Sequence, residues 1–416
     1  MRSFFIGLLA ASLVSNSPVI AQQACYSFDY QQRKLRDEPG LAIVANQVEQ
    51  FIQTNGSSTA LAVQTTSRGT PVITIPVVVH VLYNKASENI SEGTIQGLIK
   101  TLNLCYRKLH PDTIKTPVRF AGLSADCEIE FKLAVSDPRQ RATNGILRKY
   151  TAVSQWDIDD RVKSSALGGD DPWDAKSYLN IWICNLRYVS GYSSIPGDAA
   201  AKDGVVLAGG AMGKTVVHEV GHWLGLKHIW GDQYCGDDGV ADTPPQSTGT
   251  PGCPSGIRIS CNNGPNGDMY MNYMDVTGDA CVNMFTQGQK QRMLALFKPG
   301  GLRYSLFASH GLKEPLYQEI PLPAQDTVVV SDPETIPVLL YPNPAIREIT
   351  LDLGDTRQWV GKMISICNAQ GLTVMQQTLH AKTQKIDIGQ LRAGVYFILG
   401  KGSDGQVFKQ KFLKIE

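Results

Sequence analysis

The sequence has no long run of charges of one sign. Its 39 lysine and arginine residues nearly balance 38 aspartate and glutamate residues, so the net charge is only +1. Proteins that bind nucleic acids or anionic membranes carry clusters of basic residues. We therefore expect neither kind of partner.

Long apolar runs are also scarce. No segment reaches the roughly 20 consecutive apolar residues that a transmembrane helix needs, so no transmembrane segment is expected. The short apolar stretch from Phe4 to Val14 follows one arginine and precedes Val19 and Ala21, small residues at the positions that a signal peptidase reads. This pattern predicts a signal peptide over residues 1–21 and a secreted protein, either extracellular or attached to the outer cell surface.

Internal repeats and low-complexity tracts are absent. Hydrophobic residues make up 43% of the 416 residues, which is enough apolar material for more than one buried core. Behind the signal, the sequence predicts a pro-segment over 22–67, a mixed α/β unit over 68–310, a proline-rich linker over 311–336 and a small all-β sandwich over 337–416.

Hydrophobic periodicity predicts the elements of these parts. The pro-segment contains one amphipathic helical pattern, over 41–52. Continuous β-branched residues over 70–84 predict a buried strand, and apolar residues at helical spacing predict a helix over 91–106. Further strands are expected in the stretches EIEFKLAV, YLNIWICNL and DGVVLA.

Histidine is scarce, yet three of the seven histidines lie within eleven residues, in the stretch HEVGHWLGLKH. His218 and His222 are four residues apart, so on a helix both rings project from one face. Gly225 lacks Cβ and can reverse the chain, which allows His228 to return as a third ligand. Glu219 can reach a metal-bound water and act as the general base. Three neutral imidazoles and a water form an open zinc site, so the stretch predicts zinc-assisted hydrolysis.

The same stretch fits the pattern H-E-x-x-H-x-x-G-x-x-H of the metzincin metallopeptidases. The downstream stretch MNYMDVTGDACVNMFTQGQKQRM resembles the Met-turn and following helix of the pappalysins, most closely the cytophagalysin-like members. The resemblance covers about residues 75–297. It implies an α+β metzincin catalytic domain with a twisted mixed sheet, an active-site helix and a Met-turn, acting as a zinc endopeptidase on extended polypeptides.

Several site residues follow from this resemblance. Met274 is implied to lie beneath the zinc, and a helix starting at Thr286 should have a capping box completed by Gln289. The strand over 191–197 is implied to be the edge strand that pairs with substrate, through Gly191, Tyr192 and Ser193. One departure is Val276, which stands where pappalysins often carry a tyrosine. Either Tyr273 or Tyr270 substitutes for that phenol, or the enzyme works without it.

The loop between His228 and Met274 is too long and polar to be held in place by apolar packing. Nine cysteines is an odd number, and in an exported protein they can form disulfides. The resemblance implies the pairs Cys235–Cys261 and Cys253–Cys281. The same loop offers hard oxygen ligands, which predict a structural Ca²⁺ ion. These ligands are the side chains of Asp237, Asp238, Asp242 and Asp268 and the carbonyl of Thr243.

Latency and specificity are also expected. Cys25 lies near the start of the pro-segment, and a thiolate that binds zinc can displace the catalytic water, as in related zymogens. The primed-side pocket should be walled by the segment after Met274, which contains Asp275 and Asp279. Asp279 is the better candidate for binding an arginine or lysine after the scissile bond. By the same specificity, Arg68 marks an activation cut at the bond before it.

Two other readings of the chain conflict with particular residues. A thermolysin-like peptidase would use a downstream glutamate as third ligand, whereas Gly225 and His228 supply a histidine here. A non-catalytic surface adhesin on a peptidase scaffold would not need Glu219.

The C-terminal part resembles a second family. The stretches YPNPAIREITLDL, ISICNAQGLTVMQQ and IDIGQLRAGVYFILGKGSDGQVFKQKFLKI are similar to the sorting domain that the type IX (Por) secretion system recognises. The resemblance implies that this machinery is a partner and carries the protein across the outer membrane. The alternative is a carbohydrate- or protein-binding β-sandwich that stays on the mature enzyme.

Overall fold

Strand β1 (Ile73–Tyr83) is the centre of the N-terminal unit, because three other strands pair with it in parallel. They are β2 (Ile129–Leu133), β3 (Ile146–Tyr150) and β4 (Leu179–Cys184). A parallel strand is covered on both faces, which explains the continuous β-branched sequence of β1 and confirms the strand predicted over 70–84.

This computed structural model describes residues 25–56, 72–210, 213–317, 339–353, 360–368, 372–401 and 407–415. The predicted signal peptide and Arg68 lie outside them.

The other side of the sheet ends in an antiparallel edge. β4 pairs in parallel with β6 (Val205–Ala208), and β6 pairs antiparallel with β5 (Gly191–Ser193). The order is β2-β1-β4-β6-β5, with β3 also on β1. The sheet is therefore mixed, as predicted, and β5 is its edge strand.

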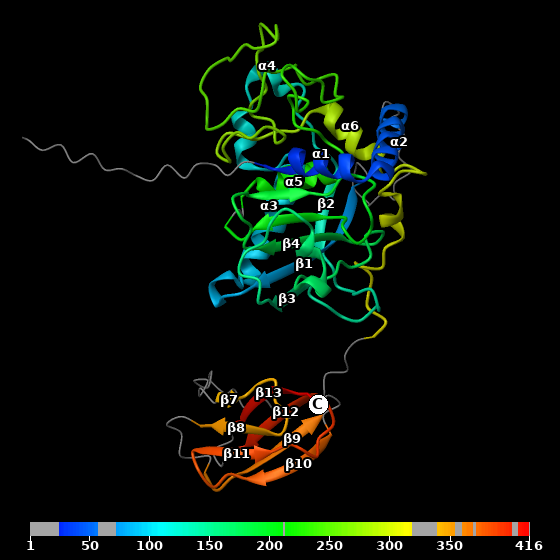
Figure 1. The fold of residues 1–416 in the computed structure, drawn as a ribbon. Helices are drawn as coiled ribbons and strands as arrows, with labels where there is room; N and C mark the ends of the chain where they lie inside the picture. The colour runs from blue at the N-terminus through cyan, green and yellow to red at the C-terminus, as the bar shows by residue number, and fades with distance from the viewer. Residues whose placement is uncertain are drawn as a thin grey trace, which may run out of the picture. The chain divides into compact units, whose positions relative to one another are not determined.

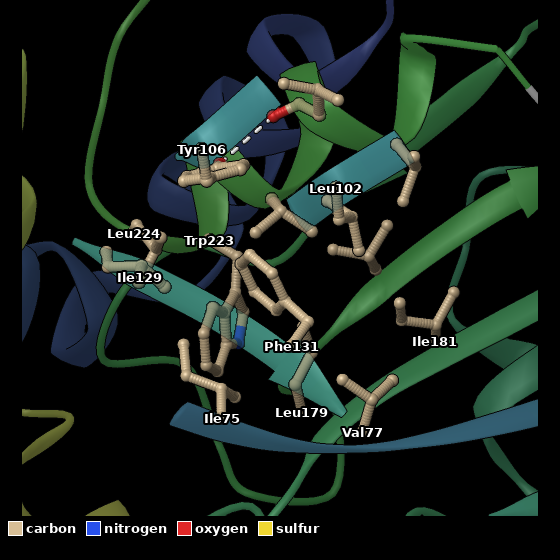
Figure 2. Close-up of a cluster of buried hydrophobic side chains, with 14 of the residues drawn as sticks. Ile75, Val77, Leu102, Tyr106, Ile129, Phe131, Leu179, Ile181, Trp223 and Leu224 are labelled. Atoms are coloured by element: carbon tan, nitrogen blue, oxygen red, sulfur yellow. Dashed lines mark hydrogen bonds between the residues drawn. The ribbon is translucent and has the colours of Figure 1, made fainter. Parts of the chain in front are cut away.

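Helices α3 (Glu92–Tyr106) and α5 (Thr215–Trp223) share a core with the sheet (Figure 2). The Ser91 hydroxyl caps α3 by accepting from the Thr94 amide. Tyr106 of α3 donates its hydroxyl to the Val217 carbonyl of α5, 3.1 Å away in an otherwise apolar region. Each fully buried side chain such as Leu102 contributes about 1.5–3 kcal/mol. The helix that carries the histidines is thus fixed against the sheet.

A buried ion pair braces the C-terminal end of α5. Asp203 and Arg303 form two hydrogen bonds, of 2.6 and 2.9 Å, and the guanidinium lies 3.8 Å from the ring centroid of Trp223. Asp203 also accepts from the Trp223 indole and from Ser194, the residue after β5. Removing one partner of such a pair costs about 3–5 kcal/mol, so this pair joins the active-site helix firmly to the edge strand.

Two helices precede the sheet in sequence, α1 (Ser27–Asp37) and α2 (Pro39–Asn55). The helix predicted over 41–52 is confirmed, but α1 was not predicted because it has few apolar residues. Its charges suit a helix, with an acid in the first turn and bases in the last. In Figure 1 both helices are blue; α1 contacts β5, and α2 contacts α6 (Gln287–Ala295).

The remaining helical elements are short. They are α4 (Val118–Ala121) and the 3₁₀ turns η1 (Ala86–Glu88), η2 (Pro111–Lys115), η3 (Arg161–Lys163), η4 (Ser165–Leu167) and η5 (Tyr304–Ala308). At α6 the expected capping box is present, because Thr286 and Gln289 each accept from the backbone amide of the other. Within the described residues, every helix is too short or too polar to cross a membrane.

The C-terminal unit consists of two antiparallel sheets. One contains β7 (Leu339–Tyr341), β8 (Glu348–Asp352) and β11 (Thr383–Asp387). The other contains β9 (Met363–Asn368), β10 (Thr373–Thr378), β12 (Gly394–Lys401) and β13 (Val407–Lys414). Their inward residues form one core, including Ile349, Ile366, Ile386 and Ile398. The predicted all-β sandwich is confirmed.

Candidate active site

The three histidines converge at the C-terminal half of α5 and the turn after it. His222 Nε2 lies 3.1 Å from His218 Nε2 and 3.2 Å from His228 Nε2. Gly225, at φ +83°, reverses the chain after α5 and lets His228 return, because glycine tolerates this conformation. The local sequence therefore produces the arrangement that the spacing predicts.

Each ring uses its other nitrogen in a hydrogen bond. Nδ1 of His218 donates to the Tyr273 carbonyl at 2.7 Å, and Nδ1 of His222 donates to the Leu226 carbonyl at 2.9 Å. Nδ1 of His228 contacts the carboxylate of Asp232. Because carbonyl and carboxylate oxygens only accept, each Nδ1 carries the proton and each Nε2 presents a lone pair.

Burial favours the neutral form of these rings. It lowers the pKa of His218 to about 3, with a further contribution from His228, and holds the pKa of His222 well below its usual value. Three neutral lone pairs that face one another without protons repel, unless a cation lies between them. The donors fit zinc, which takes neutral imidazole nitrogen in this arrangement.

Beneath the histidines, Met274 is fully buried. Its Sδ atom would lie only 2.5 Å from a Cβ added at Gly221, the residue before His222. A side chain at position 221 would therefore collide with Met274 unless the methionine moved, and glycine avoids this collision. The floor position beneath the zinc that the resemblance implies for Met274 stays a prediction.

Glu219 is completely buried beside the histidines. Its Oε2 accepts from the Ser27 hydroxyl at 2.6 Å, whereas Oε1 accepts from no described residue. Burial raises the pKa of this carboxyl to about 7, and the Ser27 hydrogen bond opposes the shift. A buried carboxylate oxygen without a hydrogen-bond donor is costly in free energy, and a water in the cleft can donate to Oε1.

Two residues at the start of the described chain, Cys25 and Ser27, lie at the histidines and Glu219. Cys25 Sγ lies 3.7 Å from His222 Nε2, and the ligand atoms of Cys25 and the three histidines all lie within 4.8 Å of one another. No other group of three or more His, Cys, Asp or Glu ligands comes this close within the described residues. Ser27 Oγ also accepts from the Ser193 amide at 3.0 Å, so α1 begins on the edge strand.

Side chains of α1 secure it along the same edge. Tyr30 lies 4.8 Å from the ring of Tyr192 and donates to Asp160. Lys34, almost fully buried, donates to both oxygens of Asp198 at 2.8 and 2.9 Å. Tyr192 therefore points its ring into the protein beneath α1.

A cavity of about 150 Å³ beside His218 and Glu219 is lined in part by residues 275–282, which we name the wall segment. Asp275 is buried and accepts from the Thr250 and Val276 amides and from Gln246. Asp279 is exposed at the cavity, where its Oδ2 accepts from the Lys214 amide at 2.8 Å. Of the two aspartates, Asp279 is thus the accessible one.

The long loop carries two disulfides, Cys235–Cys261 and Cys253–Cys281, as the resemblance implies. Its acidic residues are dispersed. Asp242 accepts from Thr286 and Gly288 at the start of α6, and Asp268 accepts from Ser260 and Asn263. Asp237 is exposed and holds the Gly239 amide.

Asp238 differs from the other loop acids because it is buried with one oxygen bare. Its Oδ1 accepts from Thr243 Oγ1 and Val240 N, while no described residue donates to Oδ2. Burial raises the pKa of this carboxyl to about 7.

Tyr270 and Tyr273 were the two candidates to replace the phenol that is missing at Val276. Within the described residues, neither hydroxyl contacts the three histidines. Tyr270 donates its hydroxyl to the Gly256 carbonyl. Tyr273 packs its ring on Phe285 in the core and serves the site through its carbonyl. Tyr273 also lines the cavity beside His218 and Glu219, and both expectations for the phenol stay predictions.

Two residues of the site were missed in the sequence. Asp232 follows His228 by four residues, and that spacing beside a ligand is a usable signal for a partner of the ring. Ser27 gave no signal, because its contact with Glu219 joins residues 192 positions apart.

The chain is similar to known extracellular metalloproteases. A family model described as "Pregnancy-associated plasma protein-A" matches residues 163–298. An extracellular metalloprotease of Pyricularia oryzae is 32% identical, over 54% of this chain and 75% of its own length.

Two solved structures extend this similarity. Mature mirolysin of Tannerella forsythia, in complex with a cleaved peptide, is 42% identical with a TM-score of 0.55, covering 57% of this chain and 96% of its own. A promirolysin mutant of the same species is 38% identical with a TM-score of 0.62. The match covers 68% of this chain and 96% of the promirolysin chain. The chain belongs to the pappalysin family of metallopeptidases. This pappalysin is a metalloprotease with a metzincin-like catalytic domain, and the similarity to promirolysin supports a pro-form.

The second unit of this pappalysin matches the model "Secretion system C-terminal sorting domain" over residues 339–414. The protein is therefore extracellular and uses a type IX secretion sorting domain. The predicted family, fold and location are confirmed.

Proposed function

We propose that this metalloprotease is a zinc-dependent endopeptidase that cleaves extended polypeptides with Glu219 as general base. The observation that carries the proposal is the bare, buried Oε1 of Glu219 beside three converging Nε2 atoms. The retained glutamate also argues against an adhesin on a peptidase scaffold.

His218, His222 and His228 would hold the zinc, with Asp232 and two backbone carbonyls orienting their rings. Bound zinc supplies Lewis-acid polarisation of the substrate carbonyl and lowers the pKa of water. Glu219 takes the proton from the attacking water and returns it to the leaving amine nitrogen. The backbone of β5 aligns the substrate as an added strand.

Replacing Glu219 by alanine should leave zinc bound, because the three histidines remain, but remove the general base. In the activated enzyme, we expect kcat/KM on a protein substrate to fall by about 10²- to 10⁴-fold. Zinc content by atomic emission checks the metal, and Glu92→Ala on the surface of α3 serves as control. Near-normal activity of Glu219→Ala would sink the assignment.

We further propose that residues 22–67 form an inhibitory pro-segment and that Cys25 is its zinc-directed switch. The 3.7 Å approach of Sγ to His222 Nε2 supports this role. Ser27 adds a second contact by occupying Oε2 of Glu219, which leaves the base less available to a water.

Cys25→Ser proenzyme should therefore hydrolyse a peptide substrate measurably before any cleavage, and Cys25→Ser with Ser27→Ala should be faster still. The rates are measured on intact chains verified by mass spectrometry. After full activation, all variants should match the wild type. Latency of the double variant equal to that of wild type would refute the switch.

Asp279 is proposed to favour arginine or lysine after the scissile bond. A charge-assisted pair contributes about 1.5–3 kcal/mol, or roughly a 10- to 100-fold preference. The same preference would place the activation cut before Arg68, giving a catalytic domain over 68–310, a linker over 311–336 and the sorting domain over 337–416.

A peptide-library profile of the wild type should show arginine or lysine enriched after the cut, and Asp279→Asn should lose the enrichment. N-terminal sequencing of the mature enzyme should start at Arg68. A flat profile or a distant N-terminus would contradict the proposal.

Asp238 is proposed to bind Ca²⁺ through its bare Oδ2, with the Thr243 carbonyl nearby in sequence. A ligand at 100 times its Kd stabilises the folded state by about 2.7 kcal/mol. Calcium should therefore raise the unfolding temperature of wild type and of the surface control Asp159→Asn, but not that of Asp238→Asn. Equal shifts in all three proteins would exclude the site.

A further inference from the structure

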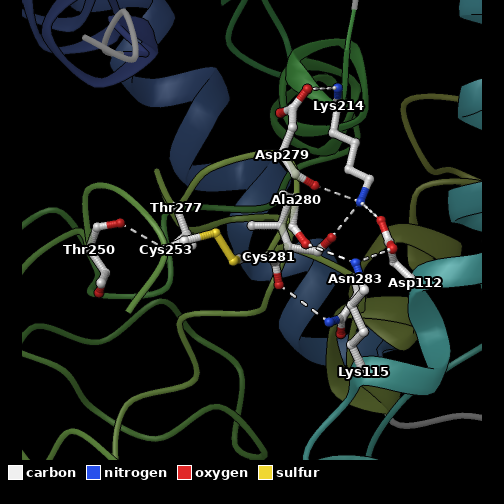
Figure 3. Close-up of a disulfide and its surroundings, with 11 residues drawn as sticks. Asp112, Lys115, Lys214, Thr250, Cys253, Thr277, Asp279, Ala280, Cys281 and Asn283 are labelled. Carbon is white, nitrogen blue, oxygen red and sulfur yellow. Dashed lines mark hydrogen bonds and ion pairs between the residues drawn. A yellow bond between two sulfur atoms is a disulfide. The ribbon is translucent and has the colours of Figure 1, made fainter. Parts of the chain in front are cut away.

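The wall segment is joined to residues 250–253 by a disulfide and hydrogen bonds (Figure 3). Cys281 is bonded to Cys253, and Thr277 donates its hydroxyl to the Thr250 carbonyl at 2.9 Å. The Gly278 amide donates to the Gly252 carbonyl at 2.7 Å. These bonds fix the segment to the loop before it, but they do not join it to the helix that carries the zinc ligands.

Lys214 makes that second connection. It precedes α5, and its almost fully buried ammonium donates to the carbonyls of Asp279 and Val282, both at 2.7 Å, and to Asp112 Oδ2 at 2.8 Å. An ammonium has three protons, so all three are used. The two carbonyls belong to the wall segment, and Asp112 belongs to η2.

The carboxylate of Asp279 is positioned by the same residue, through its backbone. Oδ2 accepts from the Lys214 amide, while no described residue donates to Oδ1. An ideal Cβ at Gly213 would lie 1.7 Å from Oδ2, so the carboxylate rests directly on that glycine. The ammonium of Lys214 bonds the main-chain oxygen of Asp279 and forms no ion pair with its carboxylate.

We propose that Lys214 is a positioning residue for primed-side specificity, which fixes the Asp279 carboxylate in place as a partner for a basic substrate side chain. Its ammonium is kept off that carboxylate by Asp112 and the two carbonyls. The proposal rests on the preference for arginine or lysine proposed above.

The sign of the expected effect separates positioning from simple electrostatics. Lys214 is a cation near an acidic pocket, so its charge alone would disfavour a basic substrate, and removing it would raise the preference. If Lys214 acts by holding the carboxylate in place, removing it lowers the preference, because a mobile carboxylate forms a weaker pair.

The test compares two peptides that differ only in arginine or citrulline after the scissile bond, since citrulline has the shape of arginine without its charge. The ratio of their kcat/KM values is measured for the enzyme after activation. In Lys214→Met this ratio should fall at least about fivefold below wild type, reflecting the weakened charge-assisted pair. Lys214→Gln, a milder change that also removes the charge, should show the same direction and serves if Lys214→Met does not fold.

Lys115→Met is the matched control. Lys115 also contacts Asp112 and the wall segment, through the Ala280 carbonyl at 3.4 Å, but its side chain is 55% exposed. Because an exposed charge is screened, the ratio in this variant should stay within about twofold of wild type. Zinc content and near-ultraviolet circular dichroism show which variants are folded and loaded.

An unchanged or raised ratio in a folded, zinc-loaded Lys214 variant would overturn the positioning role while leaving the basic preference intact. An equal fall in Lys115→Met would also overturn it, because the loss would then follow from charge in this region. A wild-type ratio near one would instead refute the preference itself.

Discussion

The proton on Nδ1 of each zinc-directed histidine is held by an acceptor that the fold supplies, and the chemistry of the cleft depends on these three bonds. Two acceptors are main-chain carbonyls, of Tyr273 in the Met-turn and Leu226 after the helix. The third is Asp232. The backbone therefore fixes the tautomers of His218 and His222, and a side chain fixes that of His228, so that Nε2 of each ring faces the other two.

The backbone course depends in turn on a few rigid supports. Tyr106 fixes α5 to α3, and the Asp203–Arg303 pair ties the end of α5 to the edge strand β5 through Ser194. Lys214 and the disulfide Cys253–Cys281 hold the wall segment. The helix, the edge strand and the wall segment are therefore parts of one frame, in which a small displacement of one element would be felt at the others.

Much of this frame could be predicted from sequence because its signals are local. The spacing of His218, Glu219, His222 and His228 and the glycine between them encode a helix and a reversal, and β-branched runs encode buried strands. The capping box at Thr286 is also a local pattern.

The features that escaped prediction all join distant parts of the chain. Ser27 meets Glu219, and the polar helix α1 is held by buried ion pairs such as Lys34 with Asp198. A single sequence shows that such residues are polar, but it does not show which distant residue each of them contacts in the fold. The acidic loop shows the converse, since Asp242 and Asp268 look like metal ligands in sequence but serve as hydrogen-bond acceptors in the fold.

The pro-segment is attached by more than its peptide link. Ile52 of α2 belongs to the same apolar core as Leu224 and Leu296, and Glu49 forms an ion pair with Arg292 of α6. None of these contacts is lost when a bond between α2 and β1 is cut. If the bond proposed as the activation site is cut, these contacts still hold the two helices on the catalytic unit, so dissociation of the helices is a step separate from the cut itself.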